Sequence, residues 1–265
     1  MDEKIGVINY NLSNFSVEEL FRWCKENVVD YVELQRKDVW PDITKKEHNI
    51  SEVARLLQKY DIKISQISTG SDFLQKTENE FNKQVWMVGE MCKMVKDLGF
   101  NQLRIDGGWP KEGVEEKDYK TLIIKGVSEV TDIASKEGVY LALDNHGVIT
   151  NDYNFLLEIL DRVHSRYLGT NFDTMNYRWY GYKVEELPDI YKKVAPYVLH
   201  THIKDGTGSR EKYKGAVLGE GEIPLLEAIK ILKENGYKGV WCVEYEGDEG
   251  ADGYKKCVDW LRNHL

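Results

Sequence analysis

The chain has 265 residues, of which 42% are hydrophobic and 31% charged, and its formal net charge is −9. This balance fits a soluble globular protein, and no apolar run approaches the ~20 residues that a membrane span requires. The negative charge repels phosphate backbones, so nucleic acid is not expected as a partner. The stretch Met1–Ile5 lacks the layout of a secretory signal, which predicts a cytoplasmic protein.

Short apolar runs alternate with amphipathic segments along the chain. Ser16 and Glu19 have the spacing of a capping box, which predicts a helix to about Glu26. Strands are predicted at 5–9, 31–34, 62–67, 103–106, 139–144, 168–173, 200–205 and 240–244. Seven further helices are predicted: one starting at 51, one through 85–95, and others at 118–136, 154–163, 187–194, 223–235 and 253–263.

This alternation predicts parallel strands joined by right-handed helical crossovers. Eight such units favour a closed (β/α)8 TIM barrel over an open doubly wound sheet. No GxGxxG motif follows the first strand, which counts against dinucleotide binding. No linker-like stretch interrupts the pattern, so residues 1–265 are expected to form a single domain of the α/β class.

Four isolated cysteines lack the spacing of a zinc knuckle or disulfide framework. They are Cys24, Cys92, Cys242 and Cys257. We expect them to be reduced thiols in the core.

Charged side chains recur at the ends of the last four predicted strands. They are Asp144, Asp173, His202 and Glu244. In a barrel these positions share the carboxyl-terminal face, where sites form. Carboxylates gathered there without a cation would raise one another's pKa, whereas three carboxylates and an imidazole suit one divalent metal ion: Mn²⁺, Mg²⁺, Co²⁺ or Zn²⁺. A helix-capping aspartate or a core histidine explains any single position, but the four together favour a metal site.

Strand periodicity places further charged groups beside these four. His200, His202 and Lys204 share one face of their strand. We interpret His200 as a supporting residue, and Lys204 either orients a substrate oxyanion or pairs with Asp173. Arg104 is expected to pair with Glu33 inside the barrel.

The longer predicted loops supply residues for substrate contact. They follow the third, fourth, sixth and seventh strands, at 70–76, 107–116, 176–186 and 206–221. From these loops and the stretch after Asp144 we select His146, Trp109, Asn176 and Arg210, together with Lys204. The rings of Tyr177, Trp179, Tyr180 and Tyr182 fit either sugar contact or a lid that packs on its own barrel. The basic loop around Arg210 either meets a phosphate or carboxylate or is solvated.

Four stretches carry a family resemblance. They are Ala142–His146, Asn171–Thr174, His200–Asp205 and Gly239–Glu246, and the segment from Gly219 to Pro224 adds to them. Across residues 139–246 the chain resembles the sugar phosphate isomerase/epimerase group of xylose-isomerase-like TIM barrels, and the earlier half agrees in layout. The motifs are specific for the superfamily and less so for the reaction.

The resemblance implies a divalent metal held by Asp144, Asp173, His202 and Glu244. In the ketose epimerases of this group the strand-five and strand-eight carboxylates also form the acid/base pair, which implies that role for Asp144 and Glu244. The family usually has glutamate where this chain has Asp144, and the missing methylene shortens its reach by about 1.3–1.5 Å. Asp144 then binds metal directly, binds it through water, or leaves proton transfer to another group such as His146.

The expected activity is isomerisation or epimerisation of a keto sugar or related polyol through an enediolate. A lyase or dehydratase would use the same intermediate and stays open. A sugar-binding barrel without catalysis and an endonuclease are further alternatives, and six histidines with a net charge of −9 count against the endonuclease. The expected partner is a small carbohydrate, with no membrane, and a homo-oligomer is compatible with the sequence.

Overall fold

Eight parallel strands alternate with helices around a closed ring. The computed structural model describes residues 3–12 and 14–265; Met1 and Asp2, from the stretch used to predict location, lie outside the described residues. The barrel strands are β1 (Ile5–Ile8), β2 (Tyr31–Gln35), β3 (Lys63–Ser68), β4 (Gln102–Ile105), β5 (Tyr140–Asp144), β6 (Leu168–Asp173), β7 (Val198–Ile203) and β10 (Trp241–Val243). They close in the order β1-β10-β7-β6-β5-β4-β3-β2, with every pair parallel. The predicted TIM barrel is confirmed.

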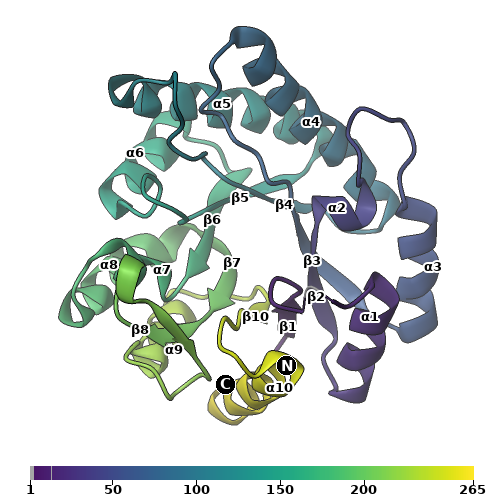
Figure 1. Ribbon diagram of the computed structural model, residues 1–265, viewed down its shortest axis with the longest axis vertical. Coiled ribbons are helices and arrows are strands. Elements are labelled where there is room, and N and C mark those ends of the chain that lie inside the picture. Colours follow the sequence, from purple (N-terminus) through teal and green to yellow (C-terminus); the bar gives the residue numbers. More distant parts are fainter. Residues whose placement is uncertain (1–2, 13) are drawn as a thin grey trace.

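Helices form the outer ring of the barrel (Figure 1). They are α1 (Val17–Glu26), α2 (Arg36–Val39), α3 (Ile50–Tyr60), α4 (Glu78–Asp97), α5 (Glu116–Glu137), α6 (Tyr153–Val163), α7 (Asn176–Tyr180), α8 (Leu187–Val194), α9 (Leu225–Glu234) and α10 (Gly250–His264). The predicted capping box at Ser16 and Glu19 is present and begins α1. None of the helices in the described ranges is long and apolar enough to cross a membrane.

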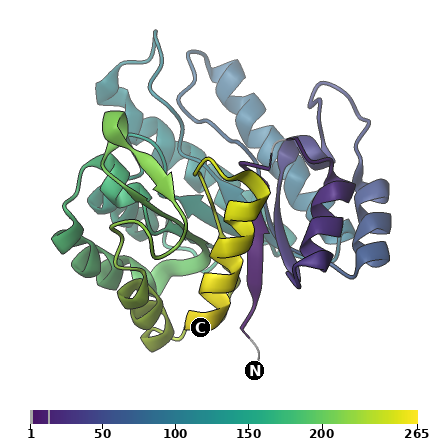
Figure 2. The same ribbon diagram turned by 60° about the horizontal axis from the view of Figure 1, so that its bottom comes forward.

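Three short features were not predicted. The helix α2 follows β2 directly, the helix α7 stands in the predicted loop after β6, and a hairpin of β8 (Asp205–Thr207) and β9 (Lys214–Ala216) stands in the predicted loop after β7. Strands of three residues and helices of four or five residues are too short to show a hydrophobic period in the sequence. In Figure 2, where β1 runs upward, the hairpin stands on the upper side, beside the strand ends.

The main core lies between the barrel and its helices and contains Cys24, Cys92 and Cys257, whereas Cys242 belongs to a separate small apolar cluster with Ile8 and Val240. All four cysteines are buried free thiols, as predicted. The barrel interior is different near the carboxyl ends of the strands, because charged and amide side chains fill it. These buried residues include Glu33, Gln66, Arg104, Asp144, Asn171, Asp173, His200 and His202. Such a set requires partners for every charge, so its hydrogen bonds decide what the site can do.

Candidate functional site

Three of the four predicted metal ligands converge at the barrel mouth. Ligand atoms of Asp173, His202 and Glu244 all lie within 4.8 Å of one another. Strand register places them there, because β6 and β7 pair Asp173 with His202 and Glu244 directly follows β10, the next strand. His202 Nδ1 lies 2.8 Å from Glu244 Oε2 and 4.0 Å from Asp173 Oδ2.

The His202 ring is held from behind by a carboxylate. Its Nε2 lies 2.7 Å from Glu33 Oε2, and both side chains are fully buried. A carboxylate on one imidazole nitrogen is the arrangement that orients metal-ligating histidines. Glu33 therefore directs Nδ1 of His202 towards Asp173 and Glu244.

The electrostatics of this cluster fit a divalent cation. Glu33, Asp144, Asp173 and Glu244 are buried carboxylates, whereas Arg104 and Lys204 are the permanent cations beside them, which leaves two negative charges. One oxygen of Asp173, Oδ2, is buried and has no hydrogen-bond partner in the described part of the chain. A buried carboxylate oxygen without a donor is costly, and a metal ion would satisfy it.

When no cation is bound, protons neutralise part of this excess negative charge. Burial raises the pKa of Asp173 to about 7. Burial opposes protonation of His202, but Glu33 and Glu244 outweigh it and raise the His202 pKa well above its usual value. Burial likewise opposes ionisation of Glu244, yet Lys204 and His202 hold its pKa well below the usual range. A metal ion requires Nδ1 of His202 without its proton, so cation and proton compete for this place.

A second set of ligand atoms is less suited to a metal. Glu33, His202 and Cys242 also come within 4.8 Å of one another. Burial raises the Cys242 pKa well above its usual value, which keeps the sulfur a thiol rather than the thiolate that binds metals. The Asp173 set is therefore the better site.

Asp144, the fourth predicted ligand, is engaged by other groups. Its Oδ2 accepts a hydrogen bond from Arg104 Nη1 at 2.8 Å, and its Oδ1 accepts one from Asn171 Nδ2 at 2.7 Å. Arg104 also pairs with Glu33, its Nε 3.1 Å from Glu33 Oε1, as predicted. To bind a cation directly, Asp144 must give up one of these donors.

Lys204 lies buried among acidic groups. Its Nζ is 2.9 Å from Glu246, 3.3 Å from Glu244 and 3.7 Å from Asp173. The predicted pairing with Asp173 is thus present, and Glu246, which also accepts a bond from Tyr213, is part of the same network. Lys204 holds Glu244 ionised and fixes its position.

A cavity of about 270 Å³ opens at the barrel mouth, and we call it the mouth cavity. It is lined by Ile8, Tyr10, Gln35, Ser68, Gly70, Ser71, Asp72, Arg104, Asp106, Trp109, His146 and Glu244. Two predicted substrate contacts, Trp109 and His146, are therefore at the cavity, with their rings edge to face at a centroid distance of 5.2 Å. Gly147, at φ +68°, lets the Trp109 ring come so close that a Cβ there would be 3.1 Å from it.

Two other predicted substrate contacts lie away from this lining. Asn176 is buried, and its Nδ2 donates to the carbonyl of Asn145. The Arg210 guanidinium lies over the rings of Trp179 and Tyr180. Tyr177 is fully buried beside Tyr191, so the aromatic loop packs at least partly on its own barrel.

Several polar residues of the barrel interior were not recognised in the sequence. Gln66 Nε2 donates to Glu33 and to Asn171 Oδ1, and His200 Nδ1 lies 2.8 Å from that same oxygen. Asn171 thus links Gln66 and Glu33 to Asp144, because its Oδ1 accepts from Gln66 and its Nδ2 donates to Asp144. A signal was available, since Gln66 and Ser68 share a strand face with Ile64, and Asn171 shares one with Asp173.

The family model described as a xylose isomerase-like TIM barrel matches residues 21–264. Inosose isomerase of Halalkalibacterium halodurans is 24% identical over 240 residues, covering 88% of this chain and 84% of that protein. Inosose dehydratase of Clostridium perfringens is 26% identical over 151 residues, or 51% of this chain and 50% of that protein. A crystal structure of IolI protein with a bound zinc atom superposes with a TM-score of 0.82 at 21% identity, covering 99% of both chains.

The matched range contains all four predicted ligands and all eight polar residues named above for the barrel interior. Together with the closed barrel, it shows that the chain belongs to the xylose isomerase-like TIM barrel family.

Proposed function

We propose that the protein is a divalent-metal-dependent isomerase or epimerase of a keto sugar or related polyol. The observation that carries this proposal is the position of Glu244. Among the four predicted ligands, Glu244 alone lines the mouth cavity, while its other contacts hold it ionised. An ionised carboxylate that faces both a cation site and a substrate-sized cavity is the equipment for moving a carbon-bound proton.

The reaction class requires a base and a means of stabilising negative charge. Removing the proton beside a sugar carbonyl gives an enediolate, and a bound divalent metal would stabilise that charge as a Lewis acid. In this chain Glu244 takes the proton, and Lys204, 3.3 Å from Glu244 Oε1, keeps it oriented. Asp173, His202 and Glu244 are the proposed principal ligands, and Asp144 is the weakest of the four because both of its oxygens already accept hydrogen bonds.

The second proton-transfer group is proposed to be His146. Its ring lines the cavity and its Nδ1 is 3.8 Å from Asp144 Oδ2, so Asp144 can polarise it. Asp144 itself does not line the cavity. The proposed pair is thus Glu244 and His146, with Asp144 acting through His146.

The rings of Tyr10 and Trp109 support a carbohydrate substrate. Both line the mouth cavity, and they are 57% and 44% exposed, so their faces are available to a ligand. The similarity to inosose isomerase supports the proposed isomerase activity. The inosose dehydratase relative keeps dehydration as the alternative, because elimination of a β-hydroxyl needs one base and one acid, as Glu244 and His146 would provide.

Solvent-exchange NMR tests the proposal. Keto sugars and inososes are incubated in D₂O with the Mn²⁺-loaded protein, and deuterium is expected to enter the C–H beside the carbonyl. Glu244→Gln should slow this exchange at least about 10³-fold because the base is lost. Glu227→Gln on the exposed surface of α9 is the matched control and should exchange like the wild type.

The products distinguish the alternatives. A product that keeps all its hydroxyl groups indicates an isomerase if the carbonyl has moved, and an epimerase if one carbon centre is inverted. A product that has lost water indicates a dehydratase. Asp144→Glu adds a sharper test: if the short side chain limits a two-carboxylate epimerisation, this variant gains epimerised product. Saturable sugar binding without exchange would instead favour a binding protein and refute the proposal.

A further inference from the structure

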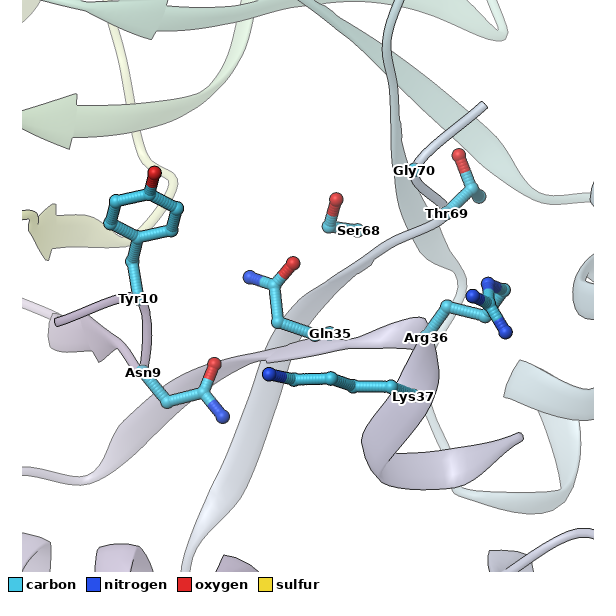
Figure 3. A pocket seen from close by; sticks show the side chains of 8 residues that line it. All are labelled: Asn9, Tyr10, Gln35, Arg36, Lys37, Ser68, Thr69 and Gly70. Atoms are coloured by element: carbon cyan, nitrogen blue, oxygen red, sulfur yellow. The ribbon is translucent and has the colours of Figure 1, made fainter. Parts of the chain in front are cut away.

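A second cavity adjoins the mouth cavity, and we call it the side pocket (Figure 3). It has a volume of about 250 Å³ and is lined by residues 9–10, 35–37 and 68–70. Tyr10, Gln35, Ser68 and Gly70 line both cavities. A ligand that reaches Glu244 in the mouth cavity can therefore extend into the side pocket.

The two cavities differ in charge. Three carboxylates line the mouth cavity, those of Asp72, Asp106 and Glu244, against one guanidinium, that of Arg104, which is already paired with Glu33 and Asp144. The side pocket is lined by two cations, Arg36 and Lys37, and by no carboxylate. In a chain with a net charge of −9 this local reversal favours an anionic group at one end of the ligand.

Lys37 is the cation that is available. It is exposed, and no ion pair or hydrogen bond of its amine is present among residues 3–12 and 14–265. Figure 3 shows its side chain extending towards Asn9, while the Arg36 guanidinium points the other way. Arg36 donates to the carbonyl of Trp40 at 2.8 Å, so part of its donor capacity is used within the protein.

Neutral donors in the side pocket are also unsatisfied. Gln35 Nε2 is buried and has no hydrogen-bond partner within the described ranges. Ser68 Oγ accepts a bond from Arg104 Nη2 at 2.9 Å, which leaves the hydroxyl proton for another acceptor. The nearby carboxylate of Asp38 is occupied, because its Oδ2 accepts from Asn9 Nδ2 and from the backbone N–H of Gln35. The side pocket thus offers an ammonium, an amide and a hydroxyl donor.

We infer that the side pocket binds an anionic group, a phosphate or carboxylate, at the end of the substrate remote from the reacting carbons. The substrate class is then an acidic keto sugar or keto polyol. The identity of the reacting end rests on the proposed function, whereas the anion site rests only on the side pocket. Arg104 connects the two, since it contacts both Ser68 at the side pocket and Asp144 behind the reacting end.

Calorimetric binding of three probes tests the inference: D-fructose, D-fructose 6-phosphate and D-fructuronate. At least one acidic sugar should bind ten times or more as tightly as fructose, and the tighter of the two identifies the anion as phosphate or carboxylate. Lys37→Gln should remove most of this preference and leave fructose binding unchanged. Lys136→Gln, an exposed lysine near the end of α5, is the matched control and should keep the preference.

Gln35→Leu provides a second variant, because it removes the unsatisfied amide without changing charge, and it should reduce the preference by a smaller factor. Equal affinities for the three sugars, or a preference that survives Lys37→Gln, would overturn the inference. The proposed function fails separately. If no keto sugar exchanges deuterium but the acidic probes still bind through Lys37, the anion site is supported and the proposed isomerase or epimerase function is refuted.

Discussion

Two aspartates end neighbouring strands of the barrel and have opposite surroundings. Asp144 on β5 and Asp173 on β6 are both fully buried. Both oxygens of Asp144 accept bonds from side-chain donors, Arg104 and Asn171. Asp173 Oδ1 accepts the backbone amides of Met175 and Asn176, and its Oδ2 has no hydrogen-bond partner in the described residues.

Strand register explains the difference. β5 and β6 pair Asp144 with Asn171, two residues before Asp173, while β6 and β7 pair Asp173 with His202. Asp144 therefore lies beside the amide and guanidinium groups of the interior, and Asp173 lies beside the proposed ligands. The same residue type at the same end of two strands is a counter-ion in one place and a proposed metal ligand with a free oxygen in the other, because the neighbours leave different atoms free.

Replacing Arg104, the cation that pairs with Asp144, should cause the largest loss of unfolding free energy. Arg104→Met leaves two buried carboxylates, Glu33 and Asp144, without their cation. Breaking a buried pair in this way costs about 3–5 kcal/mol. Urea denaturation should show this loss of unfolding free energy. Arg55→Met, which breaks an exposed pair with Glu52 on α3, should cost less than about 1 kcal/mol; similar losses for both variants would contradict the buried network.

Replacing each aspartate separately should sharpen the comparison. Asp173→Asn removes a proposed principal ligand, and we expect the affinity for Mn²⁺ to fall at least about 100-fold. Asp144→Asn should lower this affinity nearer tenfold, because losing a group that only orients a ligand or binds the ion weakly has an effect of about that size. Isothermal titration with Mn²⁺ measures both. Equal losses would show that Asp144 leaves Arg104 and Asn171 to bind the metal as strongly as Asp173 does.

Strand periodicity made the fold predictable. Most barrel strands are short runs rich in apolar residues, and several of the helices between them have clear caps, such as the capping box at Ser16 or the left-handed Gly138 that ends α5. Predicted helix ends differ from the observed ones by a few residues, as at α10, which begins at Gly250 rather than Gly253. The short elements α2, α7 and β8–β9 were missed because tertiary contacts, not a periodic pattern, define them.

The site was predictable in composition but not in connectivity. Charges at the strand ends pointed to His202, Glu244 and Asp173, and the structure brings these three together. Which donors hold Asp144 depends on the register of β5 and β6, which pairs it with Asn171, and the sequence does not reveal that register. The side pocket was missed for a similar reason, since it is built from residues distant in the chain, at 9–10, 35–37 and 68–70.

Replacing His200 should have the smallest effect. We expect it to change how steeply the unfolding free energy depends on pH. Burial lowers the pKa of His200 from 6.5 to about 3. Between these values the unfolded chain binds a proton that the folded protein does not, so the contribution of His200 to stability is full above pH 6.5 and is lost as the pH falls towards 3. The wild type should therefore lose unfolding free energy on acidification from pH 6.5 to 5 faster than His200→Gln, by about 1 kcal/mol per pH unit. Urea denaturation at several pH values measures both slopes, with His48→Gln on the surface as control. Parallel slopes for wild type and His200→Gln would show that the interior around Asn171 and Glu33 accommodates a charged His200.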